Sequence, residues 1–207
     1  MKFLRIADVG HEAAAEEAAR ALRAGGIVLY PTDTIYGLGV DALNEEAIER
    51  LRQLKGRERK KPVSILVADV ASLTEHTELH DEARALAQRH MPGALTLVVH
   101  AKPHIPESLT LNNTIGIRVP DDAFALALAR VFGQPCTATS ANLAGHRTLT
   151  TPMDIVVALG PSTRLVDLVI DDGPREADAP STVVLYTGEK PLILRPGQLS
   201  REDLGIE

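Results

Sequence analysis

Hydrophobic positions along the chain alternate between helical and strand spacing. Residues 11–23 carry Ala and Leu at helical intervals, with Glu early, Arg late and Gly25 beyond, which predicts a helix. The short apolar run 27–30 predicts the strand that follows it. Asn44 is a good N-cap residue, and the apolar positions after it share one face, so a second helix is predicted to run from there to Gly56.

The same alternation continues to the end of the chain. Further helices are predicted over residues 81–90 and 121–132 and from Thr151 onward. Further strands are predicted over residues 63–68, 94–100, 114–120, 136–139 and 165–171, with a hairpin around Gly188 over residues 181–197. Residues 31–42 are so rich in turn and hydroxyl residues that we expect no regular element there. With no repeat or linker, the pattern indicates one α/β domain over residues 1–207 with antiparallel parts.

Composition indicates the class of protein and its expected compartment. Hydrophobic residues make up 44% of the chain and charged residues 24%, which is ordinary for a globular protein. No apolar run approaches the roughly 18 residues that span a bilayer, and the N-terminus lacks an export signal. The single cysteine, Cys136, lies in an apolar run and is interpreted as a buried structural thiol. We therefore expect a cytoplasmic protein with no membrane partner.

Charge is distributed unevenly. The net charge is −6, yet residues 50–61 hold seven of the 22 basic residues and one acid, Glu58. That segment carries +6 and the rest of the chain −12. The asymmetry favours one local anion site over a surface that coats nucleic acid. Arg59 and Lys60 are interpreted as solvated cations of this segment, whereas Gly56 leaves the backbone free to aim Lys55 and Arg57 at one anion.

Several familiar motifs are absent or lack their context. There is no GxxxxGK[ST] phosphate loop and no G-x-S-x-G elbow. Residues 37–42 match GxGxxA, but the preceding strand is predicted to end near Tyr30, too early for a dinucleotide loop. His76 and His80 stand four apart without an obvious third ligand, so they are interpreted as surface histidines.

Four polar clusters come at the ends of predicted elements: "PTDT" after the strand 27–30, "KGRERKKP" after the second helix, Arg118 after "TIGI", and "TSAN" after "CTA". Ligands of α/β sheets bind at strand ends, so these clusters are expected to converge on one crevice. They supply cations, hydroxyls and an amide, but no pair of carboxylates suited to acid/base catalysis. The residues alone indicate an α/β enzyme that handles anions.

Six segments in order resemble the YrdC/YciO family of threonylcarbamoyl-AMP synthases and their relatives. They are "YPTDTIYGLG", "KGRERKKPVSILVAD", "PGALTLVV", "TIGIRVP", "TSANLAG" and "STVVLY" followed by "ILRPG". The resemblance implies a YrdC-like twisted mixed sheet with flanking helices and a concave basic groove. It implies a nucleotidyltransferase that converts L-threonine, bicarbonate and ATP into threonylcarbamoyl-AMP and pyrophosphate, for the threonylcarbamoyl modification of adenosine 37 in tRNA.

The resemblance also implies roles for individual residues. The family's Lys-x-Arg falls on Lys55 and Arg57, which are expected to hold the ATP phosphates and act in catalysis. The further residues expected to contact ATP are Lys61, Thr114, Ser140, Asn142, Thr148 and Arg195. Those expected to bind threonine are Thr34, Thr139 and Arg118, the last as partner of the carboxylate. Mg²⁺ is expected to enter with ATP, and no residue is expected to bind a metal on its own.

The chain departs from the family pattern at two positions. Glu58 stands where many members have proline, and Leu66 where some place a histidine near the threonine. Two alternatives stay open: a YciO-like relative with weak or different activity, and a protein that binds double-stranded RNA or tRNA. Few aromatic residues and an acidic remainder disfavour RNA binding. Downstream threonylcarbamoyl-transfer proteins are expected as partners of the enzyme.

Overall fold

The computed structural model describes residues 1–56, 62–146, 149–175 and 179–206. Its strands form one eleven-stranded sheet in the order β1-β9-β2-β3-β8-β4-β7-β6-β10-β11, with β5 beside β6. The strands are β1 (Lys2–Arg5), β2 (Val28–Tyr30), β3 (Gly37–Gly39), β4 (Ser64–Leu66), β5 (Thr77–Glu78), β6 (Leu95–Ala101), β7 (Thr114–Arg118), β8 (Cys136–Ser140), β9 (Leu168–Asp171), β10 (Thr182–Leu185) and β11 (Leu192–Arg195). Because β9 pairs in parallel with β1 and β2, while β8 pairs antiparallel with β3 and β4, the predicted mixed α/β sheet is confirmed.

The hydrophobic pattern predicts the five longest helices, of eight to thirteen residues, but not the three helices of four residues. The helices are α1 (Ile6–Val9), α2 (His11–Arg23), α3 (Glu45–Lys55), α4 (Leu73–His76), α5 (Asp81–His90), α6 (Ala123–Phe132), α7 (Pro152–Leu159) and α8 (Arg201–Leu204), with 3₁₀ turns η1 (Glu107–Leu109) and η2 (Gly160–Leu165). The caps are those the sequence suggests: the side chains of Asn44, Asp122 and Thr151 accept hydrogen bonds from the first turns of α3, α6 and α7. Gly56 ends α3 in the left-handed conformation, at φ 58°.

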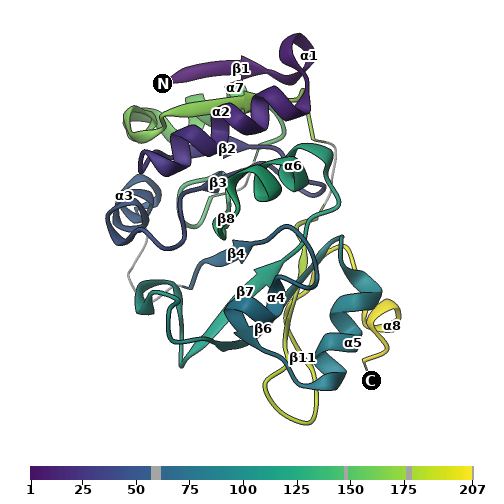
Figure 1. Cartoon of the computed structure of the whole chain (residues 1–207). Coiled ribbons are helices and arrows are strands. Elements are labelled where there is room, and N and C mark those ends of the chain that lie inside the picture. Colours follow the sequence, from purple (N-terminus) through teal and green to yellow (C-terminus); the bar gives the residue numbers. More distant parts are fainter. Residues whose placement is uncertain (57–61, 147–148, 176–178, 207) are drawn as a thin grey trace.

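The core lies on both faces of the sheet, as the alternation of side chains shows. Val28 and Tyr30 of β2 pack with α2 and α6, whereas Leu29 between them belongs to the larger cluster on the other face. Figure 1 shows α2 and α6 side by side over this half of the sheet. Four of the five buried residues of α2 are alanines, whose small side chains let the two helices approach closely.

One expectation for residues 31–42 is wrong, because Gly37–Gly39 forms β3 between β2 and β8. The glycines make this possible: a Cβ at Gly39 would lie 2.7 Å from a ring carbon of Tyr30. With both glycines of GxGxxA inside an antiparallel strand, the segment is not a dinucleotide loop. The short edge strands β1 and β5 were also not predicted, because so few residues carry little pattern.

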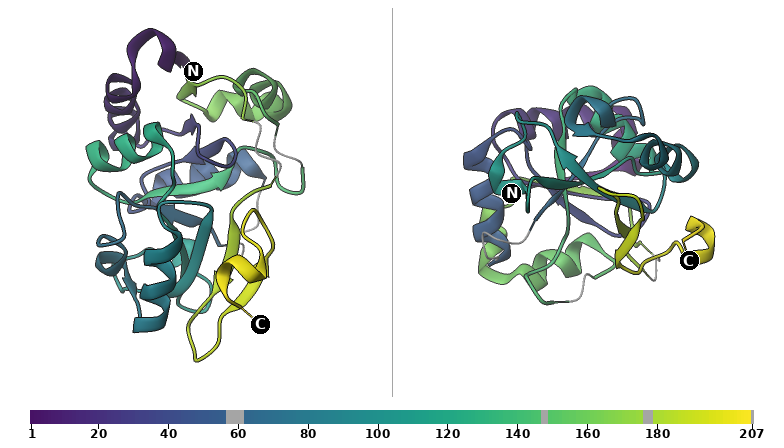
Figure 2. Two further views of the ribbon diagram at one scale, coloured as in Figure 1. Left: turned by 90° about the vertical axis from the view of Figure 1, so that its right-hand side faces the viewer. Right: turned by 90° about the horizontal axis from the view of Figure 1, so that it is seen from below.

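The two ends of the sheet are far apart in the fold. In Figure 2 the β10–β11 hairpin, coloured yellow, lies at the opposite end of the molecule from the N-terminal strand β1. The hairpin predicted around Gly188 is confirmed, because β10 and β11 pair antiparallel. Its strand β10 also pairs in parallel with β6, which brings residues 181–195 beside the central strands. Distant segments of the chain therefore meet over β6 and β7.

Candidate active site

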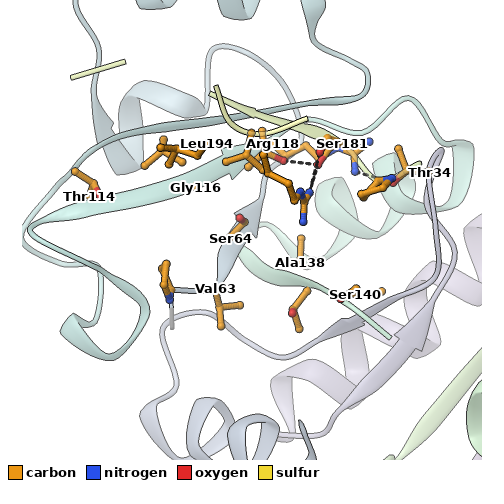
Figure 3. A pocket seen from close by; sticks show the side chains of 18 of the residues that line it. Thr34, Val63, Ser64, Thr114, Gly116, Arg118, Ala138, Ser140, Ser181 and Leu194 are labelled. Atoms are coloured by element: carbon orange, nitrogen blue, oxygen red, sulfur yellow. Dashed lines mark hydrogen bonds between the residues drawn. The ribbon is translucent and has the colours of Figure 1, made fainter. Parts of the chain in front are cut away.

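A cavity of about 620 Å³ opens over the middle of the sheet. Its floor is one face of two antiparallel strands, because alternate residues line it: Thr96, Val98 and His100 of β6, and Thr114, Gly116 and Arg118 of β7. The loop after β2 and the end of β8 form one wall, and the β10–β11 hairpin forms another. Figure 3 shows side chains from these elements pointing toward one space.

Arg118 lies at one end of the floor and is only 7% exposed. Its Nη2 donates to both carboxylate oxygens of Asp33, at 2.6 and 2.7 Å. Nη1 donates to Thr34 Oγ1 at 3.0 Å, and Nε to the Gly93 carbonyl at 3.1 Å. Burial lowers the pKa of the Arg118 guanidinium, and the charge of Asp33 opposes that shift. The result is a rigidly held guanidinium beside a threonine hydroxyl.

A second arginine approaches the same end from the hairpin. Arg195 Nη2 donates to the Ser181 carbonyl at 2.8 Å and to its hydroxyl at 3.2 Å. The Ser181 hydroxyl in turn lies 2.7 Å from the hydroxyl of Thr96 on the floor. Burial, and then the charge of Arg118, lower the pKa of Arg195. Two cations and one carboxylate, Asp33, thus give this end of the cavity a net positive charge, which favours an anionic ligand there.

Behind Ser140, at the end of β8, lies a lysine that the sequence motifs single out. Lys55, in the last turn of α3, is 3% exposed. Its Nζ donates to the Ser140 carbonyl and, at 3.3 Å, to Asn142 Oδ1. The Ser140 hydroxyl donates to the same amide oxygen at 2.6 Å. The Lys55 carbonyl accepts from the Ala144 backbone at 2.9 Å, so the end of α3 and the loop after β8 form one unit.

The structure brings six of the expected site residues to the cavity. Those that line the cavity are Thr34, Thr114, Arg118, Thr139, Ser140 and Arg195. Lys55 and Asn142 stand directly behind Ser140. Arg57, Lys61 and Thr148, together with Glu58, lie outside the described residues. Leu66 packs in the core with α2 and α6 at 1% exposure and does not line the cavity.

Several lining residues were not anticipated. Thr96 and Ser64 lie on strands. The alternation of side chains along a strand does not reveal which of its two faces lines a cavity. Ser181 precedes β10 in a predicted hairpin with no polar motif. Tyr36 lines the cavity while its hydroxyl donates to the Gly173 carbonyl at 2.7 Å and accepts from Asp172 N at 3.0 Å. Burial raises the pKa of Tyr36 to about 12, so this hydroxyl is a structural tie.

Cys136 is buried as expected, whereas His76 and His80, expected as solvated surface histidines, are half-buried and hydrogen-bonded. His76 ends α4, so His80 is not on the same helix, and the His76 imidazole is hydrogen-bonded to His104 instead, at 3.0 Å. Cys136 is fully buried, and burial raises its thiol pKa to about 12. Within the described residues no group of three or more His, Cys, Asp or Glu side chains is placed to bind a metal.

The cavity is therefore equipped to bind anions and to orient them. It offers two arginines at one end, hydroxyls along its walls and a buried lysine behind Ser140. Asp33, the acid at the Arg118 end, is engaged by that arginine and does not form half of an acid/base dyad. Positioning and charge neutralisation are what this arrangement can supply.

Residues 20–197 match the Sua5/YciO/YrdC family, whose description is "Telomere recombination". The chain belongs to the Sua5/YciO/YrdC family. Threonylcarbamoyl-AMP synthase of Bacillus subtilis (strain 168) is 36% identical over 191 residues, which are 91% of this chain and 54% of that protein. The predicted family is therefore confirmed.

Solved members of the family share the fold. P. abyssi Sua5, complexed with L-threonine, superposes with a TM-score of 0.89 at 33% identity, over 98% of this chain and 59% of that one. E. coli YciO superposes with a TM-score of 0.87 at 27% identity, over 98% of each chain. The chain thus spans little more than half the length of the Bacillus and P. abyssi relatives. No helix in the described ranges has the length and apolar character to cross a bilayer.

Proposed function

We propose that this chain is an L-threonylcarbamoyladenylate synthase, which forms threonylcarbamoyl-AMP and pyrophosphate from L-threonine, bicarbonate and ATP. The observation that carries the proposal is the buried Arg118, held beside Thr34 at the end of a cavity that Arg195 and Ser140 also line. The Arg118 end of the cavity can hold a small amino acid by its carboxylate. The remaining cations can hold a polyanion. The threonine complex of P. abyssi Sua5 and the name of the Bacillus relative support the choice of substrate.

In this proposal the cavity holds both substrates together, with the ATP phosphates close to the Arg118 end, where Arg195 also lies. Arg118 pairs with the threonine carboxylate, while Thr34 and Thr139 offer hydroxyls to the amino acid. The residues proposed to contact ATP are Lys55, Ser140, Asn142, Thr114 and Arg195, with Arg57, Lys61 and Thr148 assigned by the family pattern alone. Mg²⁺ enters bound to the nucleotide phosphates as part of the substrate.

The chemistry needs two negatively charged groups held together. The threonine amine and bicarbonate combine, with loss of water, to give the carbamate N-carboxythreonine. A carbamate oxygen attacks the α-phosphorus of ATP, a new P–O bond forms, and pyrophosphate leaves with the electron pair of the bond that breaks. Phosphoryl-type transfer depends chiefly on alignment and on neutralising charge, which lysine, arginine and Mg²⁺ provide. We place the reaction in the cytoplasm, upstream of proteins that transfer the threonylcarbamoyl group to position 37 of tRNA.

The test is a reaction with purified protein, ATP, Mg²⁺, bicarbonate and threonine, followed by detection of pyrophosphate and the adenylate. The proposal expects both products to depend on threonine and on bicarbonate. Arg118→Lys keeps the charge but loses the planar guanidinium that Asp33 and Thr34 orient, so the threonine KM should rise about tenfold or more with little change in the ATP KM. A folded protein that forms no adenylate would favour the YciO-like or RNA-binding alternatives.

A further inference from the structure

Ser64 presents to the cavity a hydroxyl that no residue described by the structure hydrogen-bonds. Ser64 is the first residue of β4 and lines the cavity. Among the described residues its hydroxyl has no hydrogen-bond partner, in contrast to those of neighbouring lining residues. The neighbours whose hydroxyls are hydrogen-bonded within the protein are Thr34, Thr96, Thr114, Ser140 and Ser181. A hydroxyl facing a cavity without a protein partner is available to a ligand.

The strand register places this hydroxyl over the centre of the floor. β4 runs parallel to β7 with Ile65 opposite Ile117, so Ser64 lies beside Gly116. Gly116 leaves the space that Ser64 occupies: a Cβ there would stand 2.4 Å from Ser64 Oγ and 3.1 Å from its Cβ. The Ser64 side chain therefore lies across the bare backbone of Gly116.

Gly116 is the midpoint between the two residues assigned to different substrates. Thr114 and Arg118 lie two residues to either side of it on the same face of β7, about 13 Å apart along the strand. Figure 3 shows Ser64 between Thr114 and the head of Arg118. If Arg118 holds the threonine carboxylate and Thr114 contacts ATP, the groups that react meet near Ser64.

We propose that the Ser64 hydroxyl donates a hydrogen bond to an anionic oxygen at the junction between the threonine carbamate and the α-phosphate. This inference rests on the proposed function and adds a substrate-contacting residue to it. As the P–O bond to the carbamate forms and the bond to pyrophosphate breaks, Ser64 keeps its proton and exchanges no atoms. Its effect is to hold and stabilise charge in a part of the cavity that apolar Val98, paired with Gly116, also lines.

Three substitutions separate the hydroxyl from the shape of the side chain. Ser64→Ala removes the hydroxyl, and since no protein partner is lost, the unfolding midpoint should stay close to that of the unmodified protein. Ser64→Thr and Ser64→Val are matched, because both add β-branched bulk that a strand accepts and only threonine keeps the hydroxyl. For each variant we would measure kcat, the KM of threonine and ATP, and thermal unfolding.

The expected result is a kcat about tenfold or more lower for Ser64→Ala and Ser64→Val, with substrate KM values changed much less and Ser64→Thr near full activity. Full activity of Ser64→Ala would overturn the inference. So would equal losses in Ser64→Thr and Ser64→Val, which would indicate bulk and not the hydroxyl, or a rise in KM at constant kcat. The proposed function is judged separately: it fails if the unmodified protein forms no adenylate, whatever the variants do.

Discussion

Arg118 and Asp33 form a two-pronged ion pair at the end of the cavity, with Nη2 2.6 and 2.7 Å from the carboxylate oxygens. Both side chains are nearly buried, at 8% and 12% exposure. Asp33 thus neutralises a cation that the fold has removed from water, and it fixes the direction in which the guanidinium points. The residue proposed to face the substrate carboxylate is held in place by a carboxylate of the protein.

Asp33→Asn should leave Arg118 as a buried charge without its partner. We expect the free energy of unfolding to fall by about 3 kcal/mol or more, and the threonine KM to rise more than the ATP KM. Urea unfolding and steady-state kinetics would measure the two effects. Glu17→Gln is the control, because its exposed pair with Lys2 should contribute less than about 1 kcal/mol. Equal effects of the two substitutions would contradict this account of Arg118.

Lys55→Met should remove the buried cation behind Ser140 while keeping most of the side-chain volume. We expect product formation to fall by about a hundredfold or more, because the charge proposed to stabilise the ATP phosphates is lost. The loop around Ser140 and Asn142 also loses its tie to α3. Arg57→Ala is expected to act in the same direction, as a prediction from the family pattern. If Lys55→Met binds ATP and forms product as well as the unmodified protein does, Lys55 only supports the loop.

Gly116→Ala should disturb both the fold and the site, because the new Cβ would meet Ser64 and lie 3.2 Å from Thr96 Cγ2. We expect about 1–3 kcal/mol of destabilisation from overpacking, with a further loss of turnover as the Ser64 side chain is displaced. Gly188→Ala is the matched control, since a Cβ there meets nothing within 4 Å and no positive φ is required. A Gly116→Ala protein as stable and active as the control would refute the close contact.

The raised pKa of Tyr36 predicts that the folded protein loses stability at alkaline pH. Burial raises it from 10.0 to about 12, so the folded state keeps a proton that the unfolded state releases. Stability from this group is present below pH 10 and is lost as the pH rises through about 12. Chemical denaturation of the unmodified protein and Tyr36→Phe across this range should show a smaller pH-dependent loss in the variant. Parallel curves would mean that Tyr36 ionises freely in the folded protein.

The hydrophobic spacing and the capping residues predict most of the helices and strands, because interactions between residues close in sequence determine these elements. The caps at Asn44, Asp122 and Thr151 were visible in sequence, since a cap and its partner lie within one helical turn. β3 was not, because a strand of two glycines exists only where the Tyr30 ring and two neighbouring strands come together. The spacing of hydrophobic residues along the chain does not reveal such a contact between distant segments.

The same distinction applies to the site. Arg118 was foreseen because it ends an apolar strand, and polar residues at strand ends gather at one crevice. Its pairing with Asp33 was not foreseen, because the two residues are 85 positions apart and the acid lies in a segment expected to be loop. Thr96 and Ser181 come together through the parallel pairing of β6 with β10, which no single segment reveals.

The most direct measurement of the central claim is mass spectrometry of the product made with ATP, Mg²⁺, threonine and isotopically labelled bicarbonate. We predict an adduct of AMP with carbon from bicarbonate and with threonine, released together with pyrophosphate. The adduct should vanish when threonine or bicarbonate is omitted. Hydrolysis of ATP without such an adduct, or an adduct that carries no bicarbonate carbon, would contradict the assignment of this cavity to threonylcarbamoyl-AMP synthesis.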